Sequence, residues 1–189
     1  MAEKIRCGWP GNDSLMVAYH DEEWGVPVHD DRQLFEKLIL DSFQAGLSWS
    51  TILKKRKNFK KAFDNFNVNK ISNYDLKKKN ELMNDAGIIR NRLKIEATVI
   101  NAQKFLEVKK EFGSFDRYIW QFVNHKTIIN KWKEVKDIPA STKESDAMSK
   151  DLKERGFKFV GATICYAFMQ AVGMVNDHPV KCFRYDNLK

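Results

Sequence analysis

The chain has 189 residues and a formal net charge of +8, and 43% of its residues are hydrophobic. This hydrophobic share is enough for a packed core and excludes an intrinsically disordered chain, while the length favours one domain. We expect no membrane span, because no apolar run approaches the required length of about 18–20 residues. The start of the sequence also lacks the apolar stretch of a secretory signal. The positive charge favours a polyanionic partner but indicates no chemistry.

Most of the first two thirds of the sequence carries apolar residues at helical spacing. One predicted helix is capped by Asp30-Asp31, and another begins near Ser48 and ends in the basic run 54–57. The stretches 92–106 and 115–123 show the same periodicity. Because no segment alternates between apolar and polar residues over several strands, we predict an all-α domain.

The last third predicts two helices joined by a short glycine-flanked link. Ser141 to Glu144 reads as a capping box at the start of the first helix, and Gly156 is placed to end it in the left-handed conformation. A strongly apolar helix then runs over about 162–172 and closes at Gly173.

The link itself is a candidate phosphate site. It consists of Gly156, Phe157, Lys158, Phe159, Val160 and Gly161. Backbone N–H groups turned outward at the N-terminus of the following helix would attract an anion, and Lys150, Lys153 and Arg155 make the surroundings basic. An ordinary helix–helix turn is the alternative.

Both ends of the chain carry residues of the zinc-binding type. Cys7 and His20 lie near the N-terminus, and His178 and Cys182 near the C-terminus. Two thiolates and two imidazoles would form a closed, structural tetrahedral zinc site. Because more than 150 residues separate the two pairs, spacing alone favours the alternative of unrelated core or surface residues. The third cysteine, Cys165, lies in an apolar stretch and is expected in the core.

Aromatic residues gather in the sequence around one acidic residue, Asp41. They are Tyr19, Trp24, Phe43 and Trp49. Aromatic faces with one carboxylate would suit a flat, cationic or proton-donating ligand. The alternative is that the aromatic residues belong to the core and that Asp41 is a solvated residue at a helix end. Periodicity does not decide between these.

From about Arg6 to Cys182 the sequence resembles the bacterial 3-methyladenine DNA glycosylase I family, within the helix-hairpin-helix glycosylase superfamily. The resemblance is carried by Arg6–Trp9, Tyr19–Pro27, Gln44–Trp49, Asp85–Arg90, Phe122–His125, Gly156–Gly161 and Val175–His178. It implies one all-α domain over 1–189 whose hairpin, 156–161, grips DNA phosphate through backbone amides. It also implies one structural zinc per chain, held by Cys7, His20, His178 and Cys182, that joins the segments 1–25 and 174–189.

The resemblance assigns roles to further residues. The base pocket would be lined by Tyr19, Trp49, Trp9 and Trp24, and the duplex wedge would be formed by Gln44, Gly46 and Leu47. The family normally has glutamate at the position of Asp41, so the carboxylate here is drawn back by about 1.3–1.5 Å. We expect Asp41 still to read the base. The alternative is a weakened or inactive paralogue that serves as a DNA-binding module.

The expected chemistry follows from two further positions. The superfamily places a catalytic aspartate where this chain has Asn176, and its bifunctional members place a nucleophilic lysine where this chain has Thr163. The resemblance therefore implies a monofunctional glycosylase that flips 3-methyladenine out of double-stranded DNA and hydrolyses its N-glycosidic bond without cutting the backbone. We expect a monomer that acts in the bacterial cytoplasm on DNA containing alkylated adenine.

Overall fold

The computed structural model describes residues 4–188, so the outermost residues of the expected segments 1–25 and 174–189 lie outside it. The first half contains α1 (Ser14–Glu22), α2 (Asp31–Gln44), α3 (Trp49–Ala62), the 3-10 turn η1 (Asp64–Phe66), α4 (Val68–Ile71) and α5 (Leu76–Asn84). The second half contains α6 (Arg92–Phe112), α7 (Phe115–Trp120), η2 (Gln121–Val123), η3 (Val135–Asp137), α8 (Lys143–Glu154), α9 (Ala162–Ala171) and α10 (Phe183–Asn187). The described part is mostly helical, as predicted, and none of its helices is long and apolar enough to cross a membrane.

Two very short strands are the departure from an all-helical chain. β1 (Ile128–Ile129) and β2 (Val175–Asn176) pair in parallel, with Ile128 opposite Val175. Strands of two residues are too short to produce a detectable alternation in sequence. They connect the segment after α7 to the segment that leads into α10.

Helix ends follow the local sequence closely. The Asp30 carboxylate accepts a hydrogen bond from the Gln33 amide at 2.9 Å, which begins α2. Ser48 caps α3, which continues past the expected basic run to Ala62. The capping box of α8 begins one residue later than predicted: Thr142 is the cap, and its partner is Ser145. Two neighbouring hydroxyl residues offer almost the same cap, so sequence alone does not select between them.

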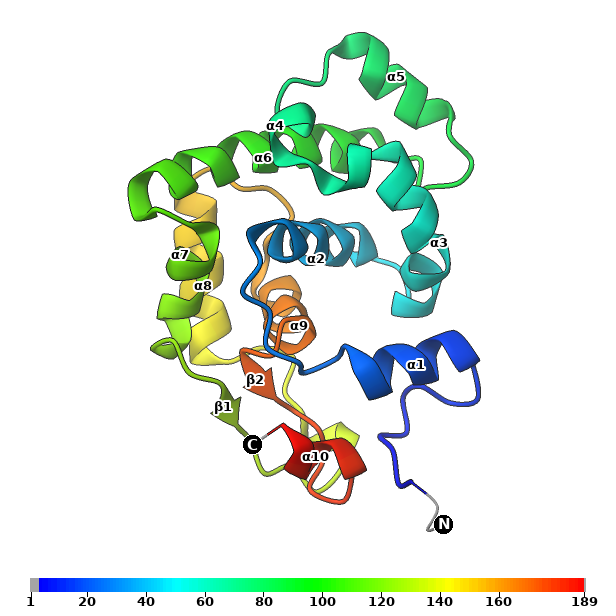
Figure 1. Cartoon of the computed structure of the whole chain (residues 1–189), viewed down its shortest axis with the longest axis vertical. Helices are drawn as coiled ribbons and strands as arrows, with labels where there is room; N and C mark the ends of the chain where they lie inside the picture. The colour runs from blue at the N-terminus through cyan, green and yellow to red at the C-terminus, as the bar shows by residue number, and fades with distance from the viewer. Residues whose placement is uncertain (1–3, 189) are drawn as a thin grey trace.

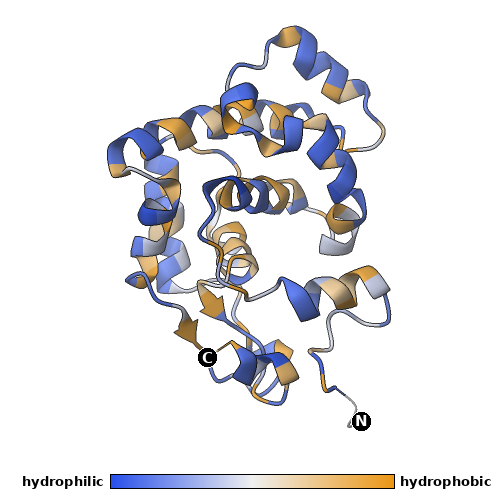
Figure 2. Cartoon of the chain, in the orientation of Figure 1, coloured by the Kyte–Doolittle hydropathy of each residue, from blue (hydrophilic) through white to orange (hydrophobic). Residues whose placement is uncertain are grey.

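Helix α2 occupies the centre of the molecule, with α3, α6 and α9 packed around it (Figure 1). Its side chains Leu34, Phe35 and Leu38 are completely buried. Figure 2 shows hydrophobic residues concentrated on α2 and α9, whereas α5 at the rim is mostly hydrophilic. Cys165 is buried in the same core, as predicted.

Gly173 allows the chain after α1 to cross the end of α9. Its φ of +71° lies in the left-handed region, and an added Cβ would come within 2.4 Å of the Pro27 nitrogen and of the Val26 carbonyl carbon. Hydrogen bonds of 3.0 Å hold this crossing on either side, from the Gly25 amide to Gln170 and from the Val28 amide to Val172. The glycine is therefore required both by backbone conformation and by space.

We predict that Gly173→Ala lowers the free energy of unfolding by more than about 3 kcal/mol, because it adds a backbone clash to left-handed strain. Gly113→Ala is the matched control, since Gly113 also has a positive φ, +88°, but nothing within 4 Å of an added Cβ. The control should lose only about 1–2 kcal/mol. Urea denaturation measures both values, and equal losses would contradict this account.

Candidate functional site

A cavity of about 460 Å³ opens between α1, α2, α9 and the segment around η3. Its wall is mainly apolar and aromatic, with a few polar groups, which is typical of a site for a small flat ligand. The lining residues are Trp9, Met16, Tyr19, Trp24, Asp41, Gln44, Trp49, Val135, Ile138, Pro139, Ala140, Thr163, Tyr166, Ala167, Gln170 and Ala171.

Asp41 supplies the carboxylate of this cavity from the last turn of α2. Only 2% of the residue is exposed, so it is not a solvated helix-end residue. Its Oδ2 atom has no hydrogen-bond partner in the described part of the chain. Burial raises the pKa of Asp41 to about 7, although the positive charge of Lys37 opposes this shift.

The predicted aromatic residues come together around this carboxylate, with one exception. The rings of Tyr19 and Trp49 have centroids 5.0 Å apart, and those of Trp9 and Trp24 are 5.2 Å apart. The indole nitrogens of Trp9 and Trp49 are buried and have no acceptor among the described residues. Phe43, by contrast, does not line the cavity and packs in the core.

A partly buried ion network beside Tyr19 was not predicted from the sequence. The Lys37 ammonium, on a residue only 4% exposed, lies 2.8 Å from Glu23 and 4.9 Å from the centroid of the Tyr19 ring. Arg56 binds both Glu23 and Glu36 at 2.7 Å. Lys37 precedes Asp41 by one helical turn, so the network places positive charge near the cavity carboxylate.

The expected wedge residues lie at the edge of this cavity, where α2 ends. Gln44 lines the cavity, Gly46 has a φ of +78°, and Leu47 is 40% exposed. The ammonium of Lys94 in α6 donates to the carbonyl oxygens of Phe43 at 2.7 Å and Ala45 at 2.6 Å. This lysine therefore fixes the turn that presents Leu47 to solvent.

The link between α8 and α9 turns its carbonyl groups inward. The Asn101 side chain bonds both the amide and the carbonyl of Lys158, at 2.8 and 3.0 Å, and Ser149 donates to the Val160 carbonyl at 2.7 Å. Gly156 has a φ of +94°, as predicted for the residue that ends α8.

Three amides of the same link are left for a ligand. The amides of Phe159, Val160 and Gly161 donate to no acceptor in the described part of the chain. The first half of the predicted hairpin is not free in this way. The amides of Gly156 and Phe157 donate to the carbonyls of Lys153 and Leu152, and the Phe157 side chain is buried in the core.

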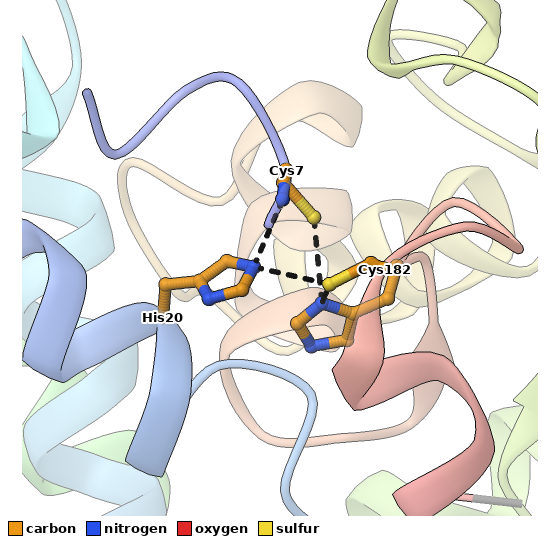
Figure 3. Close-up of side chains that lie close together, drawn as sticks. Cys7, His20 and Cys182 are labelled. Atoms are coloured by element: carbon orange, nitrogen blue, oxygen red, sulfur yellow. Dashed lines mark hydrogen bonds between the residues drawn. The ribbon is translucent and has the colours of Figure 1, made fainter. Parts of the chain in front are cut away.

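The four cysteine and histidine residues from the two chain ends form one buried cluster (Figure 3). All four possible ligand atoms lie within 4.8 Å of one another. Cys182 Sγ is 3.5 Å from His20 Nε2 and 3.4 Å from His178 Nδ1, and Cys7 Sγ is also 3.4 Å from His178 Nδ1. Bonds of about 2.0 Å to nitrogen and 2.3 Å to sulfur around a tetrahedral ion give edges of about 3.5 Å, so the cluster fits such an ion.

The remaining imidazole nitrogens have acceptors that suit metal binding. His20 Nδ1 lies 2.7 Å from Asp21, and His178 Nε2 lies 3.1 Å from the Trp24 carbonyl. Each ring thus directs its other nitrogen, free of a proton, toward the cluster. Arg6 binds Asp21 and, with its guanidinium as the main cause, lowers the pKa of that carboxyl to about 2.

The α9 wall contains residues that the sequence analysis considered only in part. Thr163 lines the cavity and offers it a small hydroxyl group. Asn176 is completely buried, and its amide donates to the Tyr185 carbonyl at 3.0 Å. Tyr166 and Gln170, which also line the cavity, had no distinctive sequence pattern.

Comparison of this chain with known proteins identifies it as a DNA glycosylase of a helical family. The methyladenine glycosylase family model matches residues 9–185. DNA-3-methyladenine glycosylase 1 of Escherichia coli strain K12 is 49% identical over 184 residues, covering 97% of this chain and 98% of the relative. This chain belongs to the methyladenine glycosylase family.

Solved structures of relatives share the fold over nearly their whole length. A crystal structure of 3-methyladenine DNA glycosylase I superposes with a TM-score of 0.93 at 47% identity, covering 95% of this chain and 98% of the other. A Tyr-to-Phe variant of such an enzyme, in complex with 3-methyladenine, gives a TM-score of 0.91 at 34% identity, covering 94% and 96%.

We predict that Asp41→Asn stabilises the protein at neutral pH. Because the folded-state pKa of Asp41 lies above its unfolded value, ionisation favours unfolding, and the wild type loses stability as pH rises from about 4 to about 7. The variant should gain on the order of 4 kcal/mol at pH 8 and nothing below pH 4. Denaturation at both pH values measures this, and an equal gain at both would contradict it.

Proposed function

We propose that this chain is a monofunctional DNA glycosylase that hydrolyses the N-glycosidic bond of 3-methyladenine in alkylated double-stranded DNA. The single observation that carries the proposal is the aromatic cavity, in which the buried Asp41 carboxylate and the indole N–H groups of Trp9 and Trp49 have atoms with no hydrogen-bond partner in the described part of the chain. Buried polar groups without partners cost free energy unless a ligand completes them. Relatives named for this activity, and one solved with 3-methyladenine, supply the identity of that ligand.

The chemistry of the substrate matches these groups. Alkylation at N3 makes adenine a cation and a good leaving group, so departure of the base neutralises charge and needs little acid catalysis. The rings of Tyr19 and Trp49 would contact the flat cation, which is attracted by their faces. The ionised Asp41 would accept hydrogen bonds from N–H groups of the base. The shorter aspartate would leave a slightly roomier pocket than glutamate does.

The surroundings of the cavity support binding to DNA. The exposed Leu47, with Gln44 and Gly46, lies where a wedge would fill the space left by a flipped nucleotide. Within the link 156–161, we assign the amides of Phe159, Val160 and Gly161 to a DNA phosphate, in the manner of a helix-hairpin-helix motif. Thr163 cannot form a Schiff base, so we expect no strand cleavage. We propose that the chain works as a single-domain monomer in the bacterial cytoplasm.

The cysteine and histidine cluster is proposed to hold one structural zinc ion. Four protein ligands of these types leave no open coordination position, so zinc would stabilise the fold and take no part in hydrolysis. Cys7, His20, His178 and Cys182 are buried together and have suitably oriented imidazoles.

We predict that the wild type releases 3-methyladenine from methylated duplex DNA and that Asp41→Asn reduces this release by about 10²-fold, because the amide cannot supply the charge of the carboxylate. Chromatography of the released bases gives the rate. Asp116→Asn is the control, since Asp116 pairs with His29 on the surface at 2.7 Å and does not line the cavity.

The variant Asp41→Glu tests whether the natural aspartate supports base release or whether its shorter side chain has abolished that activity. Release by the wild type within about tenfold of this variant supports base reading by Asp41. No release by the wild type, with release restored by the glutamate variant, would show a weakened paralogue that acts as a DNA-binding module.

We predict about one zinc ion per purified chain by elemental analysis. Cys182→Ala should lose the metal and unfold at a lower temperature, whereas Cys165→Ala, which also removes a buried thiol, should retain the metal. A metal-free wild type of unchanged thermal stability after chelation would refute the assignment.

A further inference from the structure

Asp177 lies just outside the cavity, in the short segment between β2 and Cys182. It is 1% exposed and accepts four hydrogen bonds from side chains. Its Oδ1 atom receives Asn130 Nδ2 at 2.7 Å and Trp132 Nε1 at 2.8 Å. Its Oδ2 atom receives the Tyr166 hydroxyl at 2.6 Å and Gln170 Nε2 at 2.7 Å. The carboxylate is therefore fully used and does not itself contact the cavity.

Two of these four donors belong to the cavity wall. Tyr166 and Gln170 are one helical turn apart in α9, and both line the cavity. Burial and the Asp177 acceptor raise the pKa of Tyr166, so its hydroxyl remains a donor. Asp177 thus connects the position of two wall residues to the segment that leads into the cysteine and histidine cluster.

The carboxylate also determines which way the Gln170 amide points. A carboxylate only accepts hydrogen bonds, so the NH₂ group must face Asp177. The amide oxygen of Gln170 accepts no hydrogen bond from the described residues. It is consequently the polar atom of this side chain that remains for a ligand in the cavity.

We propose that Asp177 is a positioning residue that holds Gln170 as a hydrogen-bond acceptor, and that this acceptor selects bases that present an N–H donor to the α9 wall. The proposal rests on the glycosylase function proposed above and adds a second base-reading group on the wall formed by α9. Adenine carries an amino donor at position 6, where guanine carries a carbonyl acceptor. An acceptor at Gln170 therefore favours 3-methyladenine over 3-methylguanine.

The substitution Asp177→Asn gives a specific expectation. Trp132 can only donate, so the oxygen of the new amide stays with Trp132 and its NH₂ group faces Tyr166 and Gln170. Gln170 then turns its own oxygen toward position 177 and presents its NH₂ group to the cavity. A wall acceptor becomes a donor without a change in the size of either side chain.

The test measures release of 3-methyladenine and of 3-methylguanine from the same methylated duplex DNA. For each variant, the rate for 3-methyladenine is divided by the rate for 3-methylguanine, and this ratio is compared with that of the wild type. We expect Asp177→Asn and Gln170→Met each to lower the ratio by about five- to tenfold, as expected for one lost hydrogen bond. A ratio is insensitive to a general loss of folded protein.

Two more variants complete the design. Asn130→Ala removes a hydrogen bond from the same carboxylate but leaves Tyr166 and Gln170 in place, so its ratio should equal that of the wild type. The double variant Asp177→Asn with Gln170→Glu exchanges carboxylate and amide across the contact. It restores an accepting oxygen at position 170 and should recover the ratio at least in part.

The outcomes separate this proposal from the proposed function. A wild type that releases neither base fails as a glycosylase. An active wild type whose ratio is unchanged by Gln170→Met overturns the role of Gln170, and this variant decides the point if Asp177→Asn does not fold. A lowered ratio in Gln170→Met, recovery in the double variant and no change in Asn130→Ala support the proposal.

Discussion

The meeting of the two chain ends at the cysteine and histidine cluster is the constraint on which the cavity depends. His20 follows Tyr19 directly, and the carbonyl of Trp24 binds His178. The Trp24 ring also packs against the His178 ring, with centroids 4.6 Å apart. Contacts with His178, in the C-terminal segment, therefore hold in place the aromatic wall that the N-terminal segment contributes.

The wall formed by α2 carries a free-energy cost, because it buries the carboxylate of Asp41. Asp41 is buried, and its Oδ2 atom has no hydrogen-bond partner among residues 4–188; burial raises its pKa and lowers the stability of the fold at neutral pH. The nearby Lys37 offsets part of this cost but is itself buried and paired with Glu23. Binding sites typically contain a group that destabilises the free protein and gains its hydrogen-bond partner only from a ligand. Lys37 thus lowers the cost of ionising Asp41 without forming a hydrogen bond to it, and the carboxylate stays free to bind a ligand.

Local features could be predicted from the sequence, whereas long-range polar contacts could not. Caps such as Asp30 and the ending of α8 at Gly156 depend on neighbouring residues, so their patterns were sufficient. Lys94 and Asn101 bind backbone groups about 50 residues away, and no periodicity records such a partner. The residue types of the cysteine and histidine cluster suggested a metal site, but spacing alone did not predict that residues so far apart in the sequence would meet. Phe43 belongs to the core, the alternative that periodicity left open, because aromatic residues near Asp41 in sequence need not share its face of α2.

The order of the cluster along the chain has a consequence for synthesis. His178 and Cys182 emerge from the ribosome after every other element of the cavity, including α1, α2 and α9. Until then the segment that carries Trp9 and Tyr19 can pack against Trp49 but lacks its contacts with His178 and Cys182. A nascent chain can bury the core around α2 before it can complete the aromatic wall. The contacts that bring the aromatic wall to its final position are thus the last that the growing chain can form.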